Sequence, residues 1–239
     1  MANVNHIQYY SNILSRNINL EVTGNWGYPI LMFPSSGGSY TQNTDFGLIG
    51  SVMKYIDEGR IKVYNVESLD SMSFYNDDLD TGTKVYNYDL YTQFIKNELI
   101  PYIQKECNTH RIAMAGVSFG AYHAANMAFR YPDMVSHLIA MSGAFSIRNM
   151  TPLSDDMKIY FNCPDEYMQN EESFKYQHMH IVLSTSDWDI CLDKNKNMSR
   201  ILNDKGINHW YDEKKWISHD WPLWRMVFPE YIESYFKEH

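Results

Sequence analysis

The stretch Gly116–Gly120, which reads G-V-S-F-G, constrains this chain more than any other part of the sequence. A short apolar run, Arg111–Ala115, comes before it, and a helical pattern, Phe119–Arg130, follows it. A G-x-S-x-G sequence between a strand and a helix predicts a sharp turn that strains the serine backbone and exposes its hydroxyl group. The positions two residues to either side of Ser118 must then be small, and both are glycine. Because the helix begins at the serine, its N-terminal N–H groups favour negative charge there.

An ordinary tight turn with an incidental serine could contain the same five residues. The helical pattern argues against that alternative, because Ala121, Ala124, Ala125 and Ala128 form a face of small side chains that can pack closely on a sheet. We therefore predict that Ser118 is an exposed nucleophile at the start of a helix.

Length and charge exclude several classes of protein. The chain has 239 residues, of which 44% are hydrophobic and 21% charged, as is typical of globular proteins. This length suits a single α/β domain with a sizeable core over residues 1–239. The net charge of −9 argues against a nucleic-acid partner, since phosphate binding needs a basic surface. No apolar run is long enough to span a bilayer, so no membrane partner is expected either.

Cysteine usage and the N-terminal residues bear on location. Cys107, Cys163 and Cys191 lie far apart and form no C-x-x-C pair, so neither a zinc ribbon nor a redox motif is supported. An odd number of cysteines in a chain of this size indicates free thiols and a reducing compartment. The first residues carry no basic segment followed by an apolar stretch, so no signal peptide is predicted. We expect a cytoplasmic protein.

Strand and helix patterns alternate along the chain without a repeat, a linker or a low-complexity tract. This alternation predicts a mostly parallel, doubly wound sheet with helices on both faces. The expected strands are His6–Tyr10 and Ile18–Thr23 in an opening hairpin, then Pro29–Phe33, Ile61–Val66, Arg111–Ala115, His137–Met141, Met179–Ser184 and Asn208–Asp212. The expected helices are Phe46–Asp57, Val85–Glu106 with a kink or boundary at Pro101, Phe119–Arg130, Asp193–Lys205 and Pro222–Phe236.

The least regular part of the chain lies at about 143–178. It carries Pro152 and Pro164 and short helical pieces such as Ser154–Tyr160. This excursion could cover the site as a small lid or lie on the surface as an ordinary loop, and the sequence leaves both open.

A serine hydroxyl is a poor nucleophile at neutral pH and needs a base, usually a histidine that a carboxylate orients. In folds with this nucleophile turn, the acid and then the histidine follow the serine along the chain. His219 fits, because it lies between the last expected strand and the last helix. His209 lies within that strand, on the wrong side of the loop. His123 follows Ser118 closely in sequence but is expected to be a partly buried structural histidine.

The acid should follow the strand Met179–Ser184. Both Asp187 and Asp189 lie beyond its carboxyl end, and alternate residues of an extended segment point the same way, so direction does not separate them. Hydrolases often have G-x-x-D here, and if Ser186 replaces the glycine, Asp189 is the acid. We favour Asp189 and keep Asp187 as the alternative. Asp193 is expected to cap the next helix.

The oxygen that becomes negative during attack on a carbonyl group needs two N–H donors. One should be the backbone N–H of Phe119, and the other should come from the loop after Pro29–Phe33. That loop reads P-S-S-G-G, with glycines that allow close backbone approach, and we place the donor at Ser36 or Gly37. A phosphate-cradling loop is the rival interpretation, but neither of the common phosphate-loop motifs is present.

No metal or cofactor is expected. The chain has no H-E-x-x-H motif. His178 and His180 lie at the end of their strand opposite the predicted site, where they could bind zinc only adventitiously.

Four segments together resemble the esterase D-like esterases of the α/β-hydrolase superfamily. The resemblance runs from about residue 28 to the C-terminus. It implies a three-layer α/β-hydrolase fold, no cofactor, and ester hydrolysis with Ser118 as nucleophile, Asp189 as acid and His219 as base. Ser186 departs from the family pattern, in which a glycine is more usual. The matching segments are Phe33–Gly38, Ala115–Ala121, Asp189–Asp193 and His219–Trp224.

The predicted function is a serine esterase that acts on a small-molecule carboxylic ester or thioester through an acyl-enzyme. Two alternatives stay open. The same triad would serve an acyltransferase, in which an alcohol or amine outcompetes water. A non-catalytic binding protein could also use this scaffold, because fold does not dictate function. Aromatic residues that could wall an acyl pocket, or simply pack, are Tyr40, Phe74, Tyr75, Phe119, Trp188, Trp221 and Trp224.

Overall fold

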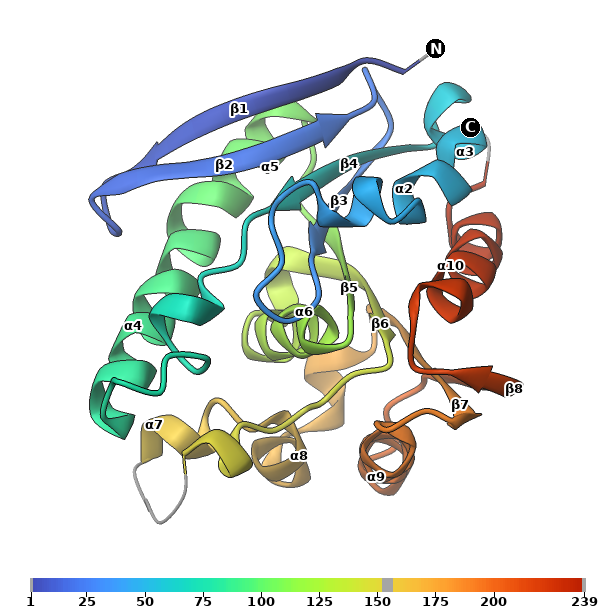
Figure 1. Ribbon diagram of the computed structural model, residues 1–239. Coiled ribbons are helices and arrows are strands. Elements are labelled where there is room, and N and C mark those ends of the chain that lie inside the picture. Colours follow the sequence, from blue (N-terminus) through green and yellow to red (C-terminus); the bar gives the residue numbers. More distant parts are fainter. Residues whose placement is uncertain (1, 152–156, 238–239) are drawn as a thin grey trace.

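The computed structural model describes residues 2–151 and 157–237, and an eight-stranded sheet forms its centre (Figure 1). The strands are β1 (Val4–Ser11), β2 (Arg16–Thr23), β3 (Tyr28–Phe33), β4 (Ile61–Val66), β5 (Ile112–Val117), β6 (Val135–Met141), β7 (His180–Trp188) and β8 (Trp210–Ser218). Their order across the sheet is β1-β2-β4-β3-β5-β6-β7-β8. From β4 to β8 neighbouring strands run parallel, whereas β2 runs antiparallel to both β1 and β4.

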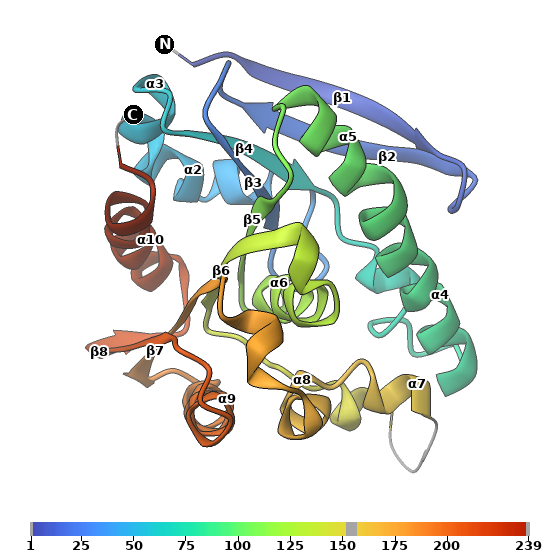
Figure 2. The same cartoon turned by 180° about the vertical axis from the view of Figure 1, so that it is seen from behind.

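Helices cover both faces of this sheet (Figure 2). The helices are α1 (Gln42–Asp45), α2 (Leu48–Ser51), α3 (Met53–Asp57), α4 (Thr81–Phe94), α5 (Ile100–Glu106), α6 (Phe119–Arg130), α7 (Met157–Tyr160), α8 (Pro164–Tyr167), α9 (Leu192–Asp204) and α10 (Trp221–Tyr235). One hydrophobic core joins a face of the sheet to α4–α9, and a second core joins the other face to α2, α3 and α10. The predicted three-layer, doubly wound α/β architecture is therefore confirmed.

The central strands supply both cores, which explains their unbroken apolar sequences. In β3, Leu31 and Phe33 belong to one core while Ile30 and Met32 belong to the other, and all four side chains are fully buried. Side chains of a strand alternate between the two faces, so a strand with helices on both sides needs apolar residues at every position.

The predicted helix Phe46–Asp57 begins later than expected and is interrupted once. Two short helices, α2 and α3, occupy most of that span, and Val52 separates them with a φ of −110° and a ψ of 8°. Helix α1 ends before the span begins, and Gly47, directly before α2, has a φ of +75°. A left-handed residue cannot continue a right-handed helix, and glycine adopts this conformation at little cost. Apolar spacing alone did not reveal the interruption.

The long helical stretch Val85–Glu106 is interrupted where Pro101 requires it. A π-helical turn, η2 (Ile95–Leu99), lies between α4 and α5, and the N–H of Ile100 bonds to the carbonyl of Ile95. A proline lacks an N–H and its ring clashes with the carbonyl four residues back, so the wider turn relieves the conflict.

The last two strands are longer than predicted. Strand β7 continues to Trp188, and β8 runs to Ser218 instead of ending at Asp212. Strand β8 lies at the edge of the sheet and pairs with β7 alone, so its outer positions are polar and part-exposed. Such a strand lacks the apolar pattern on which the prediction relied.

The excursion after β6 packs along α6. Short 3₁₀ turns, η4 (Arg148–Met150), η5 (Met168–Asn170) and η6 (Ser173–Tyr176), accompany α7 and α8 in this segment. Its Asn162 accepts hydrogen bonds from Asn126 and Arg130 of α6. Pro152 and the beginning of the predicted piece Ser154–Tyr160 lie outside the described residues. Two further 3₁₀ turns are η1 (Asp70–Met72) and η3 (Pro132–Met134).

Among the described residues, no helix combines the length and the apolar character needed to cross a lipid bilayer.

Candidate active site

Ser118 lies on the turn between β5 and α6, in a conformation that few residues other than glycine adopt. Its φ is +55° and its ψ is −120°. A Cβ atom on Gly116 would lie 2.2 Å from the carbonyl oxygen of Gly120, and one on Gly120 would lie 2.1 Å from the carbonyl oxygen of Pro34. Both glycines are therefore required by contact with backbone, as the sequence predicted, and the turn holds the Ser118 side chain at the carboxyl end of the sheet.

A chain of hydrogen bonds links Ser118, His219 and Asp189. Nε2 of His219 is 2.9 Å from Oγ of Ser118, and Nδ1 of His219 is 2.7 Å from Oδ1 of Asp189. A carboxylate can only accept, so Nδ1 carries a proton, and in the neutral ring Nε2 is left to accept the serine proton. His219 lies in the connection between β8 and α10, and Asp189 directly follows β7. The structure thus brings together the three residues that the sequence singled out.

Asp189 is buried and has three polar partners. Besides His219, the backbone N–H of Cys191 donates to Oδ1 and the hydroxyl of Ser142 donates to Oδ2, at 2.7 and 2.5 Å. Burial alone would raise the pKa of Asp189, but the hydrogen bonds from these groups and the charge of His219 lower it below its usual value. The carboxylate is therefore ionised at neutral pH and accepts from the imidazole.

Ser142 is a supporting residue that the sequence analysis missed. Its hydroxyl receives a hydrogen bond from the indole N–H of Trp224 at 2.9 Å while donating to Asp189. Ser142 also has a positive φ of +59°, directly after β6. No pattern in the sequence marks this position, because the contact depends on β6 and β7 being neighbours in the sheet.

The pKa of His219 is raised. Burial works in the opposite direction, but hydrogen bonds with Asp189 and Cys191 and the negative charge of Asp189 outweigh it and raise the pKa from 6.5 to about 9. The imidazolium form is thus stabilised, which helps a base that must hold a proton during the reaction.

Asp187, the alternative acid, has a different partner. Its Oδ1 accepts the backbone N–H of Trp216 in β8 at 2.8 Å. Trp216 has a φ of +63° and lies where the pairing of β7 with β8 shifts register. Asp187 therefore stabilises an irregular part of the edge strand.

Ser186 replaces the glycine that is more usual three residues before the acid. The N–H of Asp189 bonds to the carbonyl of Ser186, which closes the turn, and the Ser186 hydroxyl donates to the carbonyl of Ile217 in β8. The serine is fully buried and makes a bond to the neighbouring strand that glycine could not make.

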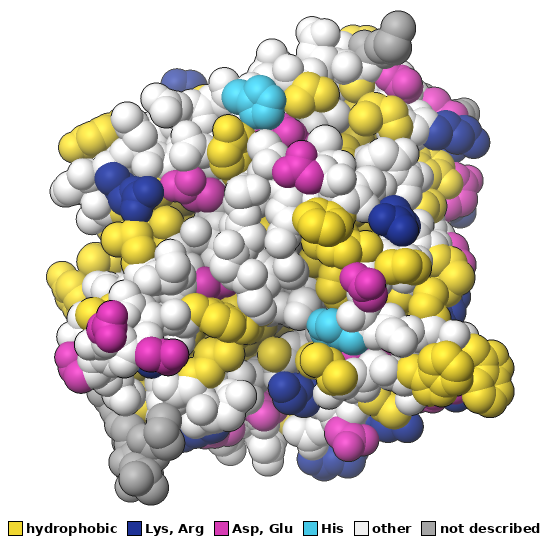
Figure 3. All heavy atoms as spheres, in the orientation of Figure 1, with side chains coloured by type: hydrophobic (Ala, Val, Ile, Leu, Met, Phe, Trp, Pro, Cys, Tyr) yellow, Lys and Arg dark blue, Asp and Glu magenta, His cyan; other side chains and the backbone are white. Residues whose placement is uncertain are grey.

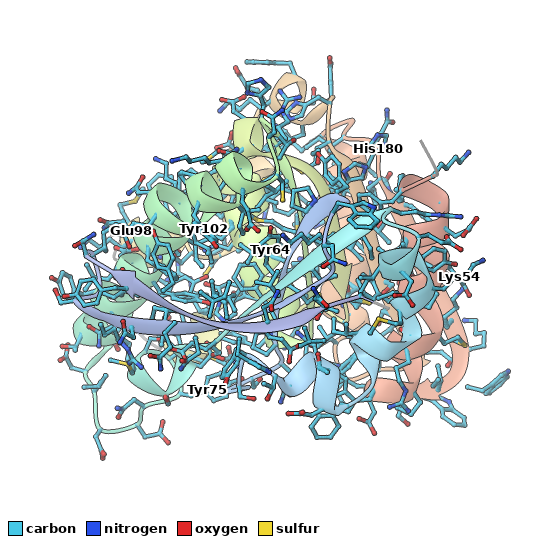
Figure 4. The ribbon with its side chains drawn as sticks, turned by 90° about the horizontal axis from the view of Figure 1, so that it is seen from above. Lys54, Tyr64, Tyr75, Glu98, Tyr102 and His180 are labelled. Carbon is cyan, nitrogen blue, oxygen red and sulfur yellow. The ribbon has the colours of Figure 1, made fainter. Side chains whose placement is uncertain are left out.

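The two candidate oxyanion donors next to β3, Ser36 and Gly37, differ in their hydrogen-bond partners. The N–H of Gly37 donates to Oδ2 of Asp70 at 2.8 Å, so it is directed into the protein. Ser36 is exposed, and its hydroxyl is 2.7 Å from the hydroxyl of Tyr75, which is labelled in Figure 4. Phe119, the other predicted donor, is the first residue of α6.

The remaining histidines and acids lie elsewhere. His123 is fully buried and bonds to Asp70 instead of Ser118. His209 precedes β8 instead of lying within it, and bonds to Ser199. His180 stacks on His137 and lies at the opposite end of the molecule from Tyr75 in Figure 4, away from the site as expected. Asp193 does not cap α9, since the helix begins one residue before it.

Two groups of residues with metal-ligand side chains occur in the described part of the chain. They are Asp189, Cys191 and His219, and Cys163, Asp165 and Glu166, each with ligand atoms within 4.8 Å of one another. In the first group the carboxylate and the imidazole already bind each other. In the second, Glu166 forms a double hydrogen bond with Arg148, and burial raises the pKa of the Cys163 thiol to about 11, which disfavours the thiolate that binds metals. Neither group matches a dedicated metal site.

Exposed aromatic side chains lie on the strands and loops that carry Asp189 and His219. Figure 3 shows hydrophobic side chains gathered on the side of this face where β7, β8 and α10 lie. Trp188 and Trp216 are exposed and meet edge to face with ring centroids 5.7 Å apart, while Phe46 stacks on Trp221. Trp224 and Phe74, in contrast, are buried and pack in the cores.

Comparisons with known proteins identify the family of this chain. The sequence model of the family described as "Putative esterase" matches residues 11–232. A search of curated proteins found no match.

Three solved structures illustrate the similarity of fold. A ferulic acid esterase is 16% identical, with a TM-score of 0.78 over 100% of this chain and 99% of the other. An S-formylglutathione hydrolase from Staphylococcus aureus is 13% identical, with a TM-score of 0.76 over 99% and 97% of the two chains. The fluorophosphonate-binding serine hydrolase F of the same organism is 13% identical, with a TM-score of 0.75 over 99% of both. With the family match over nearly its whole length, the chain belongs to this esterase family and is a carboxylic ester hydrolase with the fold of these structures.

Proposed function

We propose that this protein hydrolyses small-molecule carboxylic esters, and by the same chemistry thioesters, through a covalent acyl-enzyme on Ser118. The observation that carries the proposal is the hydrogen-bonded chain from Ser118 through His219 to Asp189, at 2.9 and 2.7 Å. Nucleophile and base within hydrogen-bond reach, with the base oriented by a third group, are the signature of an activated serine.

In the acylation step, His219 Nε2 takes the proton of the Ser118 hydroxyl while Oγ attacks the carbonyl carbon of the ester. A tetrahedral intermediate forms, and its oxygen carries the negative charge. The carbon–oxygen bond to the alcohol then breaks, and His219 returns the proton to the leaving alcohol. Asp189 holds the ring orientation throughout and stabilises the imidazolium.

In the deacylation step, His219 takes a proton from water, and the resulting nucleophile attacks the acyl carbon. The second tetrahedral intermediate collapses, the carboxylic acid leaves, and the proton returns to Ser118. One ester and one water are consumed, and one acid and one alcohol are released.

The backbone N–H groups of Phe119 and Ser36 form the oxyanion hole in this proposal. Phe119 begins α6, where N–H groups point toward the N-terminal end of the helix. Of the two candidates beside β3, Gly37 is already bound to Asp70, which favours Ser36.

The variant Ser118→Ala tests the proposal. Hydrolysis of p-nitrophenyl esters and thioesters of increasing acyl length should fall about 10⁴- to 10⁶-fold for every substrate that the wild type accepts. Ser51→Ala is the matched control, because the Ser51 hydroxyl bonds only within its own turn of α2 to the carbonyl of Leu48. Equal turnover by wild type and Ser118→Ala would overturn the assignment of the nucleophile.

A further inference from the structure

The two proposed oxyanion donors come from separate parts of the chain. Phe119 lies on α6, whereas Ser36 lies on the loop of residues 34–38 that follows β3, which we call the oxyanion loop. A hole formed by two elements works only if the distance between them is fixed, because displacement of a donor by about 1 Å can cost about 10²-fold in rate.

Asp70 binds the oxyanion loop from the interior of the protein. Its Oδ2 accepts the N–H of Gly37, the residue after Ser36, at 2.8 Å. Gly37 is exposed at the surface, whereas Asp70 is only 1% exposed. Gly37 has a φ of +62°, a conformation that glycine adopts readily, and this turns its N–H toward the carboxylate.

The other oxygen of Asp70 is bound to α6. Oδ1 is 2.8 Å from Nε2 of His123, and both side chains are 2% exposed. His123 lies one helical turn after Phe119, and the two rings meet edge to face with centroids 4.8 Å apart. A continuous path of two hydrogen bonds therefore joins α6 to the oxyanion loop, beside both proposed donors.

The chemistry of the Asp70 carboxylate fixes the direction of the hydrogen bond between Asp70 and His123. The carboxylate of Asp70 can only accept, so Nε2 of His123 donates to it, while Nδ1 of His123 is 3.2 Å from the hydroxyl oxygen of Tyr88, which also accepts from the amide nitrogen of Asn126. Asn126 is itself fixed by the hydroxyl of Tyr167, which donates to its carbonyl oxygen.

We propose that Asp70 and His123 are positioning residues that set the separation of the two oxyanion donors, and so act on catalysis without touching the substrate. This inference rests on the proposed function of Ser118. A buried carboxylate is costly to maintain and contributes little to stability compared with apolar packing, so its connection to a surface loop beside the nucleophile calls for a role beyond the core. In this role the pair resembles the groups that orient metal ligands from a second layer.

A graded pair of variants tests the proposal. Asp70→Ala removes the acceptor for the Gly37 N–H, whereas Asp70→Asn keeps one oxygen that can accept it. With a p-nitrophenyl ester that wild type hydrolyses, kcat should fall about 50-fold in Asp70→Ala and about 5-fold in Asp70→Asn, with KM within about threefold of wild type. The inhibition constant of phenylboronic acid, which forms a tetrahedral adduct with the serine, should rise in parallel with the loss of kcat.

A matched control separates positioning from loss of stability. Tyr176→Phe deletes a buried hydroxyl that donates to the carbonyl of Phe129 at the far end of α6. It should lower the melting temperature while kcat and boronate inhibition stay at wild-type values. All measurements are made well below each variant's melting temperature, which circular dichroism determines.

The possible outcomes distinguish failure of the positioning role of Asp70 from failure of the proposed function of Ser118. Folded Asp70→Ala with kcat within about twofold of wild type would overturn the positioning role alone. If Asp70→Ala does not fold, the test uses Asp70→Asn instead. A kcat and a boronate inhibition constant equal to those of wild type in Asp70→Asn would overturn the positioning role. A wild-type protein without Ser118-dependent turnover would overturn the proposed function, and this inference with it.

Discussion

The carboxylate of Asp189 and the imidazole of His219 lie 2.7 Å apart, although 30 residues separate them in the chain. Strands β7 and β8 are neighbours in the sheet, and the connections at their carboxyl ends bring the two side chains to the same edge. Ser118 directly follows β5 and therefore lies at the same carboxyl ends of the strands, where β6 alone separates β5 from β7. The parallel order of the strands thus assembles groups from distant parts of the sequence.

Replacement of the two neighbouring aspartates should have unequal effects. Asp189→Asn should lower kcat by about 10⁴-fold, because the amide can leave the histidine with its proton on the wrong nitrogen. Asp187→Asn should leave kcat within about twofold of wild type, since an amide oxygen can still accept the N–H of Trp216. Steady-state kinetics of both variants on one ester provides the measurement. A larger loss in Asp187→Asn would move the acid to Asp187.

The pH profile should shift to alkaline values. His219 must be neutral to accept the serine proton, so kcat/KM is low where it is protonated and rises as pH increases through its pKa. With that pKa raised from 6.5 to about 9, the rising limb should have a midpoint well above 6.5. In Asp189→Asn the residual activity should show a midpoint at lower pH, because the main source of the upward shift is lost. A wild-type midpoint at or below 6.5 would contradict this electrostatic account.

Gly120→Ala should damage both stability and turnover. The new Cβ would lie 2.1 Å from the carbonyl oxygen of Pro34, so the loop that carries Ser36 must move away from α6. We expect a loss of about 1–3 kcal/mol in the free energy of unfolding and a fall in kcat of about tenfold or more.

Gly50→Ala is the control for that variant. Gly50 lies in α2, nothing lies within 4 Å of the position of its added Cβ, and alanine favours helices by up to about 1 kcal/mol. Urea denaturation measures the unfolding midpoint of each variant, and ester kinetics measures its kcat. Unchanged unfolding midpoint and kcat in Gly120→Ala would show that the loop does not depend on this close approach.

Much of the fold could be predicted because short sequence patterns indicate individual strands and helices. Strand β4 and helix α6 have the bounds that the sequence indicated, since apolar runs and an alanine face are local signals. The interruption of the predicted helix at Val52 and the extension of β8 beyond Asp212 were not predicted, because one depends on a single backbone conformation and the other on pairing with one neighbour.

Prediction of the site was limited by contacts between distant segments. Ser118 and His219 were located by a motif and by chain order. Asp70 and Ser142 belong to no motif, and only the folded chain brings them to Gly37 and Asp189. His123 was expected to be structural, and sequence alone gave no sign of its link to the oxyanion loop.

The central claim is that Ser118 is an activated nucleophile, and reaction with a fluorophosphonate tests it most directly. After brief exposure, intact-mass spectrometry and peptide mapping should find one adduct per chain, on Ser118, and none in Ser118→Ala. His219→Ala should react far more slowly, because the base is missing. Folded wild-type protein that forms no adduct, or forms it on another residue, would contradict the account.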